Sequence, residues 1–270
     1  MNKQLYHLIE KSIEQLATDE LNNCEVIGWA SPVITFGDPS NCSIATLGLN
    51  PSNKEFVNDE GNELSLKDQR FPTLRSLKIP CWSKATDQCV HQIYDACTNY
   101  FTRNPYDSWF KSLDKIISGT KSSYYHPLFE ACHLDLTPFA TSRKWSELSP
   151  HQRNELIEKT GHCLGGVLKH SDIKLLVLNG QGVVSSLLDA SDLKLARTKT
   201  RHWTLPRKSG KDVPGFAYEG KLTKFRGVQL DREISVLGYN HNIQSSFGVT
   251  TKIRDSIRDW ISGRSMELAL

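Results

Sequence analysis

The chain has 270 residues, of which 38% are apolar and 23% charged, a composition typical of a folded globular protein. This apolar content excludes a mainly disordered chain, and the length suits one large α/β domain or two small ones. The 33 Lys and Arg residues nearly balance the 30 Asp and Glu residues. The formal charge is therefore only +3, which by itself argues weakly against a nucleic-acid partner.

The sequence carries no signal for a membrane. No apolar run approaches the roughly 20 residues of a membrane-spanning helix, and the first residues do not follow the pattern of a signal peptide. The seven cysteines are scattered without a CxxC pair. Cys89, Ile93 and Cys97 share one face of a predicted helix, which favours buried thiols over metal ligands. We therefore expect a cytoplasmic protein with reduced cysteines, no membrane partner and no metal or other cofactor.

The apolar pattern predicts an opening helix and then strands that alternate with helices. Residues 1–22 contain the opening helix, over Lys3–Leu21. Short apolar runs flanked by turn residues predict four strands, and a fifth candidate precedes them: Ile44–Leu49, His133–Thr137, Leu175–Asn179 and Ile234–Gly238, with Val26–Phe36 as the fifth. Helical patterns occupy five further segments: Asp87–Phe101, Trp109–Ile117, Pro150–Lys169, Val183–Leu188 and Thr251–Ile261.

This order of elements predicts the fold class. Short buried strands separated by helices are typical of a parallel sheet with helices on both faces. We expect an α/β fold with three layers, α/β/α, around a central four-stranded parallel sheet, in a single domain over residues 1–270. Two segments, at about 53–130 and 193–232, exceed what such a core needs and are predicted to be insertions.

Polar residues follow the predicted strands, at the edge of the sheet where α/β proteins bind ligands. The sequence Gly-Leu-Asn-Pro-Ser occupies residues 48–52 after the first strand, and Asp135 lies in the second strand. Residues 180–182, Gly-Gln-Gly, follow the third strand, and we interpret them as a tight turn. The fourth strand leads into a loop that contains His241 and a pair of serines.

Together these motifs resemble those of the uracil-DNA glycosylase superfamily, which has a Gly-x-Asp/Asn-Pro motif after its first core strand and a histidine in a late loop. The resemblance covers the order of elements from about Ile44 to Ile261, although the family's Pro-Ser after the histidine is missing here. It implies that Asn50 holds the attacking water and that His241 donates to O2 of the leaving pyrimidine. An amide orients water but stabilises an oxocarbenium-like transition state less than a carboxylate does.

The resemblance also implies which residues hold the base and the DNA. Phe71 is expected to stack on a base flipped out of the duplex, and Phe56 is the alternative because the insertion blurs the alignment. Leu49 is expected to contact the same base. The loop after the fourth strand is expected to fill the gap in the duplex, and two serines to bind flanking phosphates. These residues are Ile243, Gln244 and Ser245 for the gap, and Ser52 and Ser246 for the phosphates.

Asp135 departs from the family, because uracil-specific members usually have asparagine at this position. An asparagine amide pairs with O4 and N3–H of uracil, whereas cytosine presents an amino group and a bare N3. A buried aspartic acid that keeps its proton can accept from that amino group and donate to N3. The resemblance thus favours a cytosine derivative, such as a modified cytosine of phage DNA. The alternative is structural: Asp135 caps a turn near Thr137 or pairs with Arg143.

The near-neutral total charge conceals a strong asymmetry. Residues 1–60 hold three Lys and Arg against nine Asp and Glu, whereas residues 193–232 hold eleven against three. The basic segment includes Lys199 and Arg201 and is interleaved with aromatic residues such as Trp203 and Phe216. It therefore suits a face that binds phosphates and stacks on bases, with a solvated hairpin or loop as the alternative.

We therefore predict a monomeric, monofunctional DNA glycosylase. It flips a pyrimidine out of double-stranded DNA, of phage origin if the modified cytosine is the target, and leaves an abasic site. A glucosylated hydroxymethylcytosine is an example of such a base. Two alternatives remain: a uracil-DNA glycosylase of base-excision repair, and a non-catalytic DNA-binding protein of the same fold.

Overall fold

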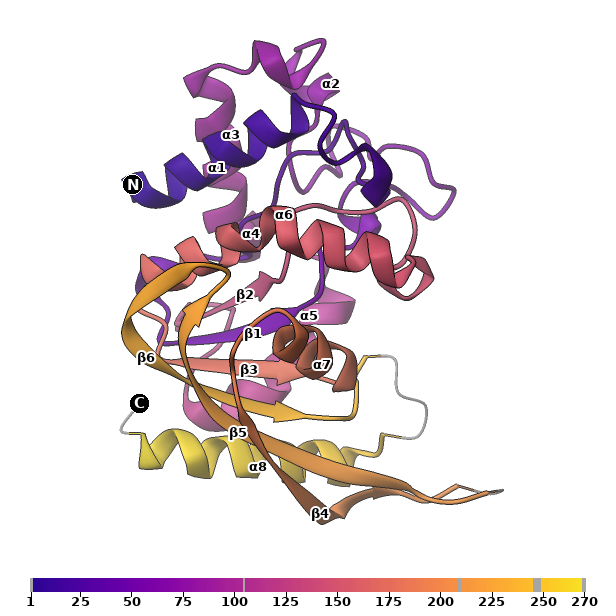
Figure 1. Ribbon diagram of the computed structural model, residues 1–270, viewed down its shortest axis with the longest axis vertical. Coiled ribbons are helices and arrows are strands. Elements are labelled where there is room, and N and C mark those ends of the chain that lie inside the picture. Colours follow the sequence, from indigo (N-terminus) through magenta and orange to yellow (C-terminus); the bar gives the residue numbers. More distant parts are fainter. Residues whose placement is uncertain (1, 104, 208–209, 245–248, 269–270) are drawn as a thin grey trace.

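The protein has an α/β fold built on one six-stranded mixed sheet (Figure 1). The computed structural model describes residues 2–103, 105–207, 210–244 and 249–268. The strand order is β2-β1-β3-β6-β5-β4. The strands are β1 (Ile44–Gly48), β2 (Ala131–Asp135), β3 (Leu175–Asn179), β4 (Leu195–Leu205), β5 (Val213–Phe225) and β6 (Val228–Tyr239).

Four of these strands, β2, β1, β3 and the second half of β6, run parallel to one another. They are the four that the apolar runs predict, and the bounds of β3 agree with the prediction. All five residues of β1 and of β3 are buried, because helices cover both faces of the sheet. Since the strands are parallel, their carboxyl ends meet at one edge, which is where the polar motifs lie.

The expectation of a sheet with only four parallel strands is wrong. β5 pairs antiparallel with β6, and β4 pairs antiparallel with β5. The turn between β5 and β6 is Arg226-Gly227, with φ of 43° and 80°, and positive φ at both turn residues suits a tight hairpin. Most of the described part of the predicted insertion at 193–232 is thus sheet. Its strands carry many exposed charged residues, so no continuous apolar run marks them in the sequence.

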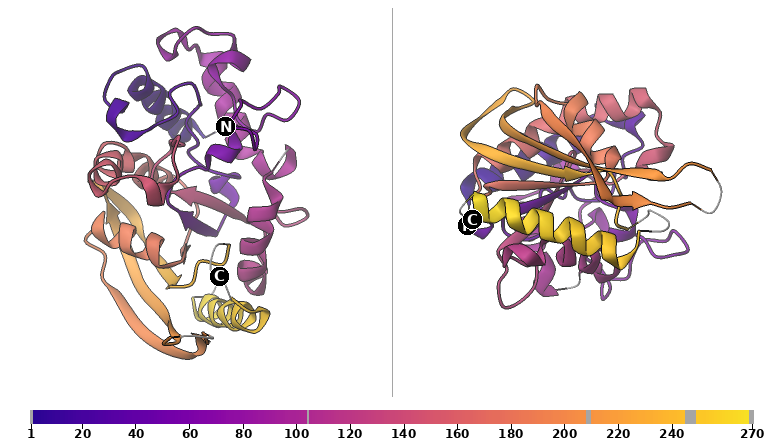
Figure 2. Two further views of the ribbon diagram at one scale, coloured as in Figure 1. Left: turned by 90° about the vertical axis from the view of Figure 1, so that its right-hand side faces the viewer. Right: turned by 90° about the horizontal axis from the view of Figure 1, so that it is seen from below.

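Helices cover both faces of the sheet in three layers (Figure 2). α6 (Pro150–Lys169) and α7 (Gln181–Asp189) lie on one face, and α5 (Asp107–Ile117) and α8 (Thr251–Glu267) on the other. α1 (Lys3–Leu16) packs on α6 and on α3 (Asp87–Thr98). α6 has the predicted bounds, because Ser149 accepts from the backbone of Gln152 and Pro150 occupies the first turn.

Cys89, Ile93 and Cys97 are buried on one face of α3, as their spacing predicts. Two short helices complete the set, α2 (Leu74–Leu77) and α4 (Tyr100–Arg103). The candidate strand at Val26–Phe36 does not form; the segment makes single bridges from Val26, Ala30 and Phe36 to three different partners. The described part of the chain contains no helix that is both long and apolar enough to cross a membrane.

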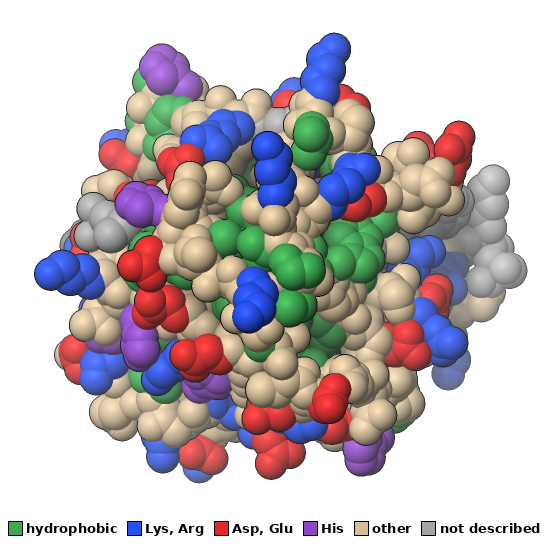
Figure 3. Space-filling view, turned by 90° about the horizontal axis from the view of Figure 1, so that it is seen from above, with side chains coloured by type: hydrophobic (Ala, Val, Ile, Leu, Met, Phe, Trp, Pro, Cys, Tyr) green, Lys and Arg blue, Asp and Glu red, His purple; other side chains and the backbone are tan. Residues whose placement is uncertain are grey.

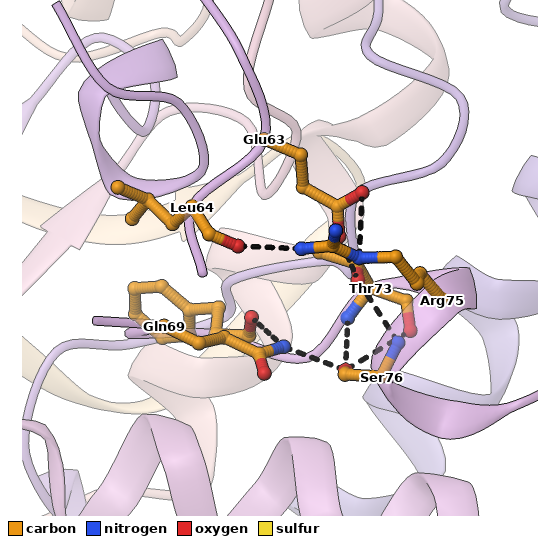
Figure 4. A network of polar contacts seen from close by, with 7 residues as sticks. Glu63, Leu64, Gln69, Thr73, Arg75 and Ser76 are labelled. Atoms are coloured by element: carbon orange, nitrogen blue, oxygen red, sulfur yellow. Dashed lines mark hydrogen bonds and ion pairs between the residues drawn. The ribbon is translucent and has the colours of Figure 1, made fainter. Parts of the chain in front are cut away.

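The long segment between β1 and α3 contains little regular structure, and polar contacts hold part of it in place (Figure 4). Thr73 and Ser76 cap each other at the start of α2, and Gln69 donates to both Ser76 and the carbonyl of Phe71. Glu63 accepts from Thr73 at 2.5 Å and pairs with Arg75 at 3.2 Å. These bonds fix the backbone on both sides of Arg70, a residue of the candidate site described below.

The two ends of the molecule are built from different elements. At the end that carries α1 and α3, the side chains of Lys and Arg are mixed with those of Asp and Glu around apolar side chains (Figure 3). By contrast, the β4–β5 hairpin projects away from the body at the opposite end (Figure 1). Lys199 and Arg201 are exposed on this hairpin.

Candidate functional site

A cavity of about 190 Å³ lies at the carboxyl ends of the parallel strands. Its wall is contributed by the residues after β1, the end of β2, the end of β3, the loop after β6 and helix α5. Predicted site residues that line it are Leu49, Asn50, Ser52 and Asp135. The other lining residues are Phe36, Gly48, Glu55, Tyr106, Trp109, Phe110, His133, Trp145, Asn179, Val183 and Asn242.

The amide of Asn50 is held in one orientation. Its Nδ2 donates to Oγ1 of Thr141 at 3.0 Å and lies 3.5 Å from the carbonyl oxygen of Phe139. The Thr141 hydroxyl donates its proton to the carbonyl of Arg143 at 2.7 Å, so toward Asn50 it can only accept. The nitrogen of the amide therefore faces Thr141, and the oxygen faces the other way. Within the described ranges no protein donor is bonded to this oxygen, which leaves it free to accept from a water.

Gly48 makes room for the two side chains beside it. β1 and β2 pair Gly48 with Asp135, so the Asp135 side chain lies against the backbone of Gly48. A Cβ at position 48 would overlap Oδ1 of Asp135 and would lie 2.9 Å from Nε2 of His133. The glycine at the start of the first motif is therefore required by the carboxylate of the second.

Hydrogen bonds link the core to His133, which lies beside Asp135. The Tyr124 hydroxyl lies 2.6 Å from Oγ1 of Thr46, which lies 2.7 Å from Nδ1 of His133. Nε2 of His133 is 3.5 Å from Oδ1 of Asp135. If the Thr46 hydroxyl donates to Nδ1, the imidazole carries its proton on Nε2, facing the carboxylate. Burial raises the pKa of Tyr124 well above its ordinary value, so this phenol keeps its proton.

Glu55 is a site residue that the sequence motifs missed. It lies in a short 3-10 turn, Asn53–Glu55, directly after the first motif, and is only 2% exposed. Burial raises the pKa of Glu55 to about 7, while the Tyr100 hydroxyl and Arg70 oppose the shift. The available signal is the position of this acid between the motif and an apolar pair, Phe-Val at 56–57, which favours a buried carboxyl.

His241 does not reach the cavity. Its side chain is buried, and Nε2 lies 2.6 Å from the carbonyl oxygen of Trp203 in β4. Burial lowers the pKa of His241 below its usual value, so the ring is neutral and Nε2–H donates to that carbonyl. The next residue, Asn242, lines the cavity instead. The donation to the base that the resemblance implies for His241 is therefore not available in this geometry.

Neither Phe71 nor Phe56 lines the cavity. Both rings are fully buried, and Phe71 stacks on Tyr100 with centroids 5.2 Å apart. Phe71 also packs against Phe36, which does line the cavity, so it supports the wall from behind. Phe71 is therefore not placed to stack on a molecule in the cavity, because its ring points into the core. The aromatic rings at the wall are Phe36, Tyr106, Trp109, Phe110 and Trp145.

The loop after β6 is tied to the sheet. Nδ2 of Asn179 donates to Oε1 of Gln244 at 2.5 Å, and Oδ1 of Asn179 accepts from the backbone of Ile243 at 3.3 Å. Gln244, predicted at the duplex gap, therefore helps to hold this loop, and Ile243 is buried. The predicted residues Ser245 and Ser246 lie outside the described residues.

The basic hairpin reaches the same edge of the sheet. β4 and β6 are both antiparallel to β5, so β4 runs parallel to β6 and its carboxyl end points to the cavity side. Lys199 and Arg201 are exposed on β4, two residues apart. The guanidinium of Arg197 lies 3.6 Å from the ring centroid of Phe216, which fixes this side chain on the strand pair.

A larger groove of about 940 Å³ adjoins the cavity and shares four of its lining residues, Leu49, Trp109, Trp145 and Asn242. Basic side chains along this groove are those of Lys144, Arg153 and Arg226, and acidic ones are those of Glu158 and Asp189. A group attached to a molecule in the cavity can therefore extend into the groove.

Among the described residues, no three His, Cys, Asp or Glu side chains group closely enough to hold a metal ion. Comparison with known families finds no family model that matches the chain, and no curated protein matches its sequence. The likeness to the uracil-DNA glycosylase superfamily therefore depends on the short sequence motifs alone.

Proposed function

We propose that this protein is a monofunctional DNA glycosylase that flips a pyrimidine nucleotide, takes the base into the 190 Å³ cavity and leaves an abasic site. The observation that carries the proposal is the fixed orientation of the Asn50 amide. Its nitrogen is bonded to Thr141, so its oxygen can hold a water at the cavity wall. That water attacks C1′ of the sugar as the bond between C1′ and the base breaks.

The base is a cytosine derivative. Asp135 places a carboxyl group in the cavity, and a carboxyl oxygen accepts a hydrogen bond from the exocyclic amino group of cytosine. Uracil has no such amino group. The pairing of Asp135 with Gly48 and the contact with His133 support a role in the cavity over the alternative of a turn cap.

A substituent on the cytosine has space in the adjoining groove. The groove shares Trp109 and Trp145 with the cavity and offers planar polar side chains such as Arg153 and Asn154. Such a mixture of aromatic and planar polar groups suits a polar, hydroxylated substituent. A glucosylated hydroxymethylcytosine of phage DNA is a base of this kind.

The DNA strand is held by the basic hairpin. Lys199 and Arg201 project from β4, whose carboxyl end points to the cavity side of the sheet. Cations at this position neutralise phosphates of the bound strand.

Excision from defined oligonucleotides tests the proposal. Purified protein is incubated with duplexes that contain one uracil, cytosine, 5-hydroxymethylcytosine or glucosylated 5-hydroxymethylcytosine, and alkali then cleaves abasic sites. We expect strand breaks with the substituted cytosine, lost in Asn50→Ala and retained in Asn23→Ala, an exposed asparagine used as the control. Breaks at uracil alone would identify a uracil-DNA glycosylase instead. Binding to every duplex without breaks would identify a non-catalytic DNA-binding protein.

A further inference from the structure

Two carboxyl groups from different elements line the same small cavity. Glu55 comes from the 3-10 turn after β1, and Asp135 comes from the end of β2. Their side chains are 3% and 4% exposed. Burial raises the pKa of Glu55, and the negative charge of Asp135 in the same small cavity raises it further.

The surroundings of Glu55 differ from those of Asp135. The Tyr100 hydroxyl lies 3.0 and 2.8 Å from the two carboxyl oxygens of Glu55 and accepts from the backbone N–H of Tyr106 at 2.7 Å. Its own proton therefore goes to Glu55. The nearest cation is Arg70, whose Nε is 3.9 Å from Oε2 of Glu55, beyond hydrogen-bond distance.

Asp135 lies beside the imidazole of His133, with 3.5 Å between Oδ1 and Nε2. The other charged group that acts on Glu55 is Asp135 itself, which raises the pKa of Glu55, although burial is the larger cause. Glu55 is thus well placed to hold a proton near neutral pH.

We propose that Glu55 is the acid that protonates N3 of the flipped cytosine-type base, while a carboxyl oxygen of Asp135 accepts a hydrogen bond from its amino group. The assignment rests on the proposed function. It also favours a cytosine derivative over uracil, because the two bases leave with different charges. Uracil leaves as an anion, which the carboxylate of Asp135 opposes. A cytosine protonated at N3 is a cation, which the same carboxylate stabilises, and it leaves as a neutral molecule when its bond to C1′ breaks.

The step is balanced. The proton passes from the Glu55 carboxyl to N3, and the electron pair of the bond between C1′ and N1 goes to N1, which releases a neutral base. The water on Asn50 adds its oxygen to C1′. The proton that this water loses returns to the carboxyl pair and restores it for the next turnover.

The test is the pH dependence of excision in single-turnover experiments on the substituted-cytosine duplex. For the unaltered protein we expect the rate to fall as the pH rises through about 7, where Glu55 loses its proton. Glu55→Gln is expected to lower the rate roughly 100-fold and to abolish this fall, while Glu55→Asp recovers part of the rate. Glu60→Gln, an exposed glutamate of the same segment, is the control and is expected to keep the rate and the profile.

Two further measurements separate chemistry from folding and from the proposed function. Glu55→Gln is expected to bind the duplex as tightly as the unaltered protein and to lose an infrared band of a protonated carboxyl near neutral pH. An unaltered protein that excises no base would overturn the proposed function. Excision by the unaltered protein with an unchanged rate and profile in Glu55→Gln would overturn the assignment of Glu55 alone.

Discussion

Gly48 and Asp135 face each other across β1 and β2, and the Asp135 carboxylate occupies the space where a side chain at position 48 would lie. The two motifs that the sequence shows 87 positions apart are therefore one structural unit. Position 48 requires glycine because the Asp135 side chain lies directly against its backbone, and His133 occupies part of the same space.

Gly48→Ala is expected to destabilise the protein by about 1–3 kcal/mol, because Asp135 and His133 must move to admit the methyl group. The loss of excision rate, expressed as a free energy, is expected to exceed the loss of unfolding free energy, because the displaced carboxylate belongs to the cavity. Urea unfolding and single-turnover excision measure the two effects. Gly263→Ala in α8 is the matched control, because nothing lies within 4 Å of where its Cβ would be. Equal behaviour of the two variants would contradict the close packing.

Thr141→Val is expected to slow excision about fivefold to tenfold. The substitution removes the acceptor that orients the Asn50 amide, a bond worth about 1 kcal/mol. Thr141→Ser keeps the hydroxyl and is expected to keep the rate. Asn50→Ala removes the water-holding oxygen and is expected to cost about 100-fold or more. If Thr141→Val left the rate unchanged, the orientation of the amide would not matter for the reaction.

Glu55 is expected to make stability depend on pH. Burial raises its pKa from 4.5 to about 7, so folding favours the protonated form. The stability linked to this group is fully present below pH 4.5 and is lost as the pH rises through 7. The loss is about 3 kcal/mol relative to Glu55→Gln, which does not titrate. Urea unfolding of both proteins across this range measures it, and a constant difference between them would speak against a buried carboxyl.

Lys199→Gln and Arg201→Gln are expected to weaken DNA binding uniformly across sequences. Each lost phosphate contact reduces the slope of log K against log salt by about 0.9. The measurement is fluorescence anisotropy with a labelled duplex at several salt concentrations. Lys11→Gln on α1 is the control, an exposed cation on another part of the molecule. An unchanged slope in the double variant would exclude the hairpin from the DNA interface.

His241→Ala is expected to affect folding more than chemistry. The ring donates to the carbonyl of Trp203 and so links the end of β6 to β4. Losing this buried bond is expected to cost about 1–3 kcal/mol, while the single-turnover rate stays within a few-fold. Thermal unfolding and excision are measured on the same preparation. A rate lowered 100-fold at unchanged stability would restore the catalytic role that the sequence resemblance implies.

The sequence by itself determined the parallel half of the sheet, the bounds of α6 and the place of Asn50 and Asp135 at the carboxyl ends of strands. These features depend on local signals, namely apolar runs, a capping serine and proline, and the turn that follows a buried strand. Such signals act within one element, so a single sequence displays them.

Only the tertiary structure decided which side chains meet. The pairing of β4 and β5 with β6, the inward turn of Phe71, the bond from His241 to Trp203 and the burial of Glu55 all join segments far apart in the chain. Charged, half-exposed strands carry no periodic apolar pattern, and a carboxyl becomes a site group only when distant residues remove water from it. The physical reason is that packing and desolvation are set by the whole core, whereas periodicity and capping are set by a few neighbouring residues.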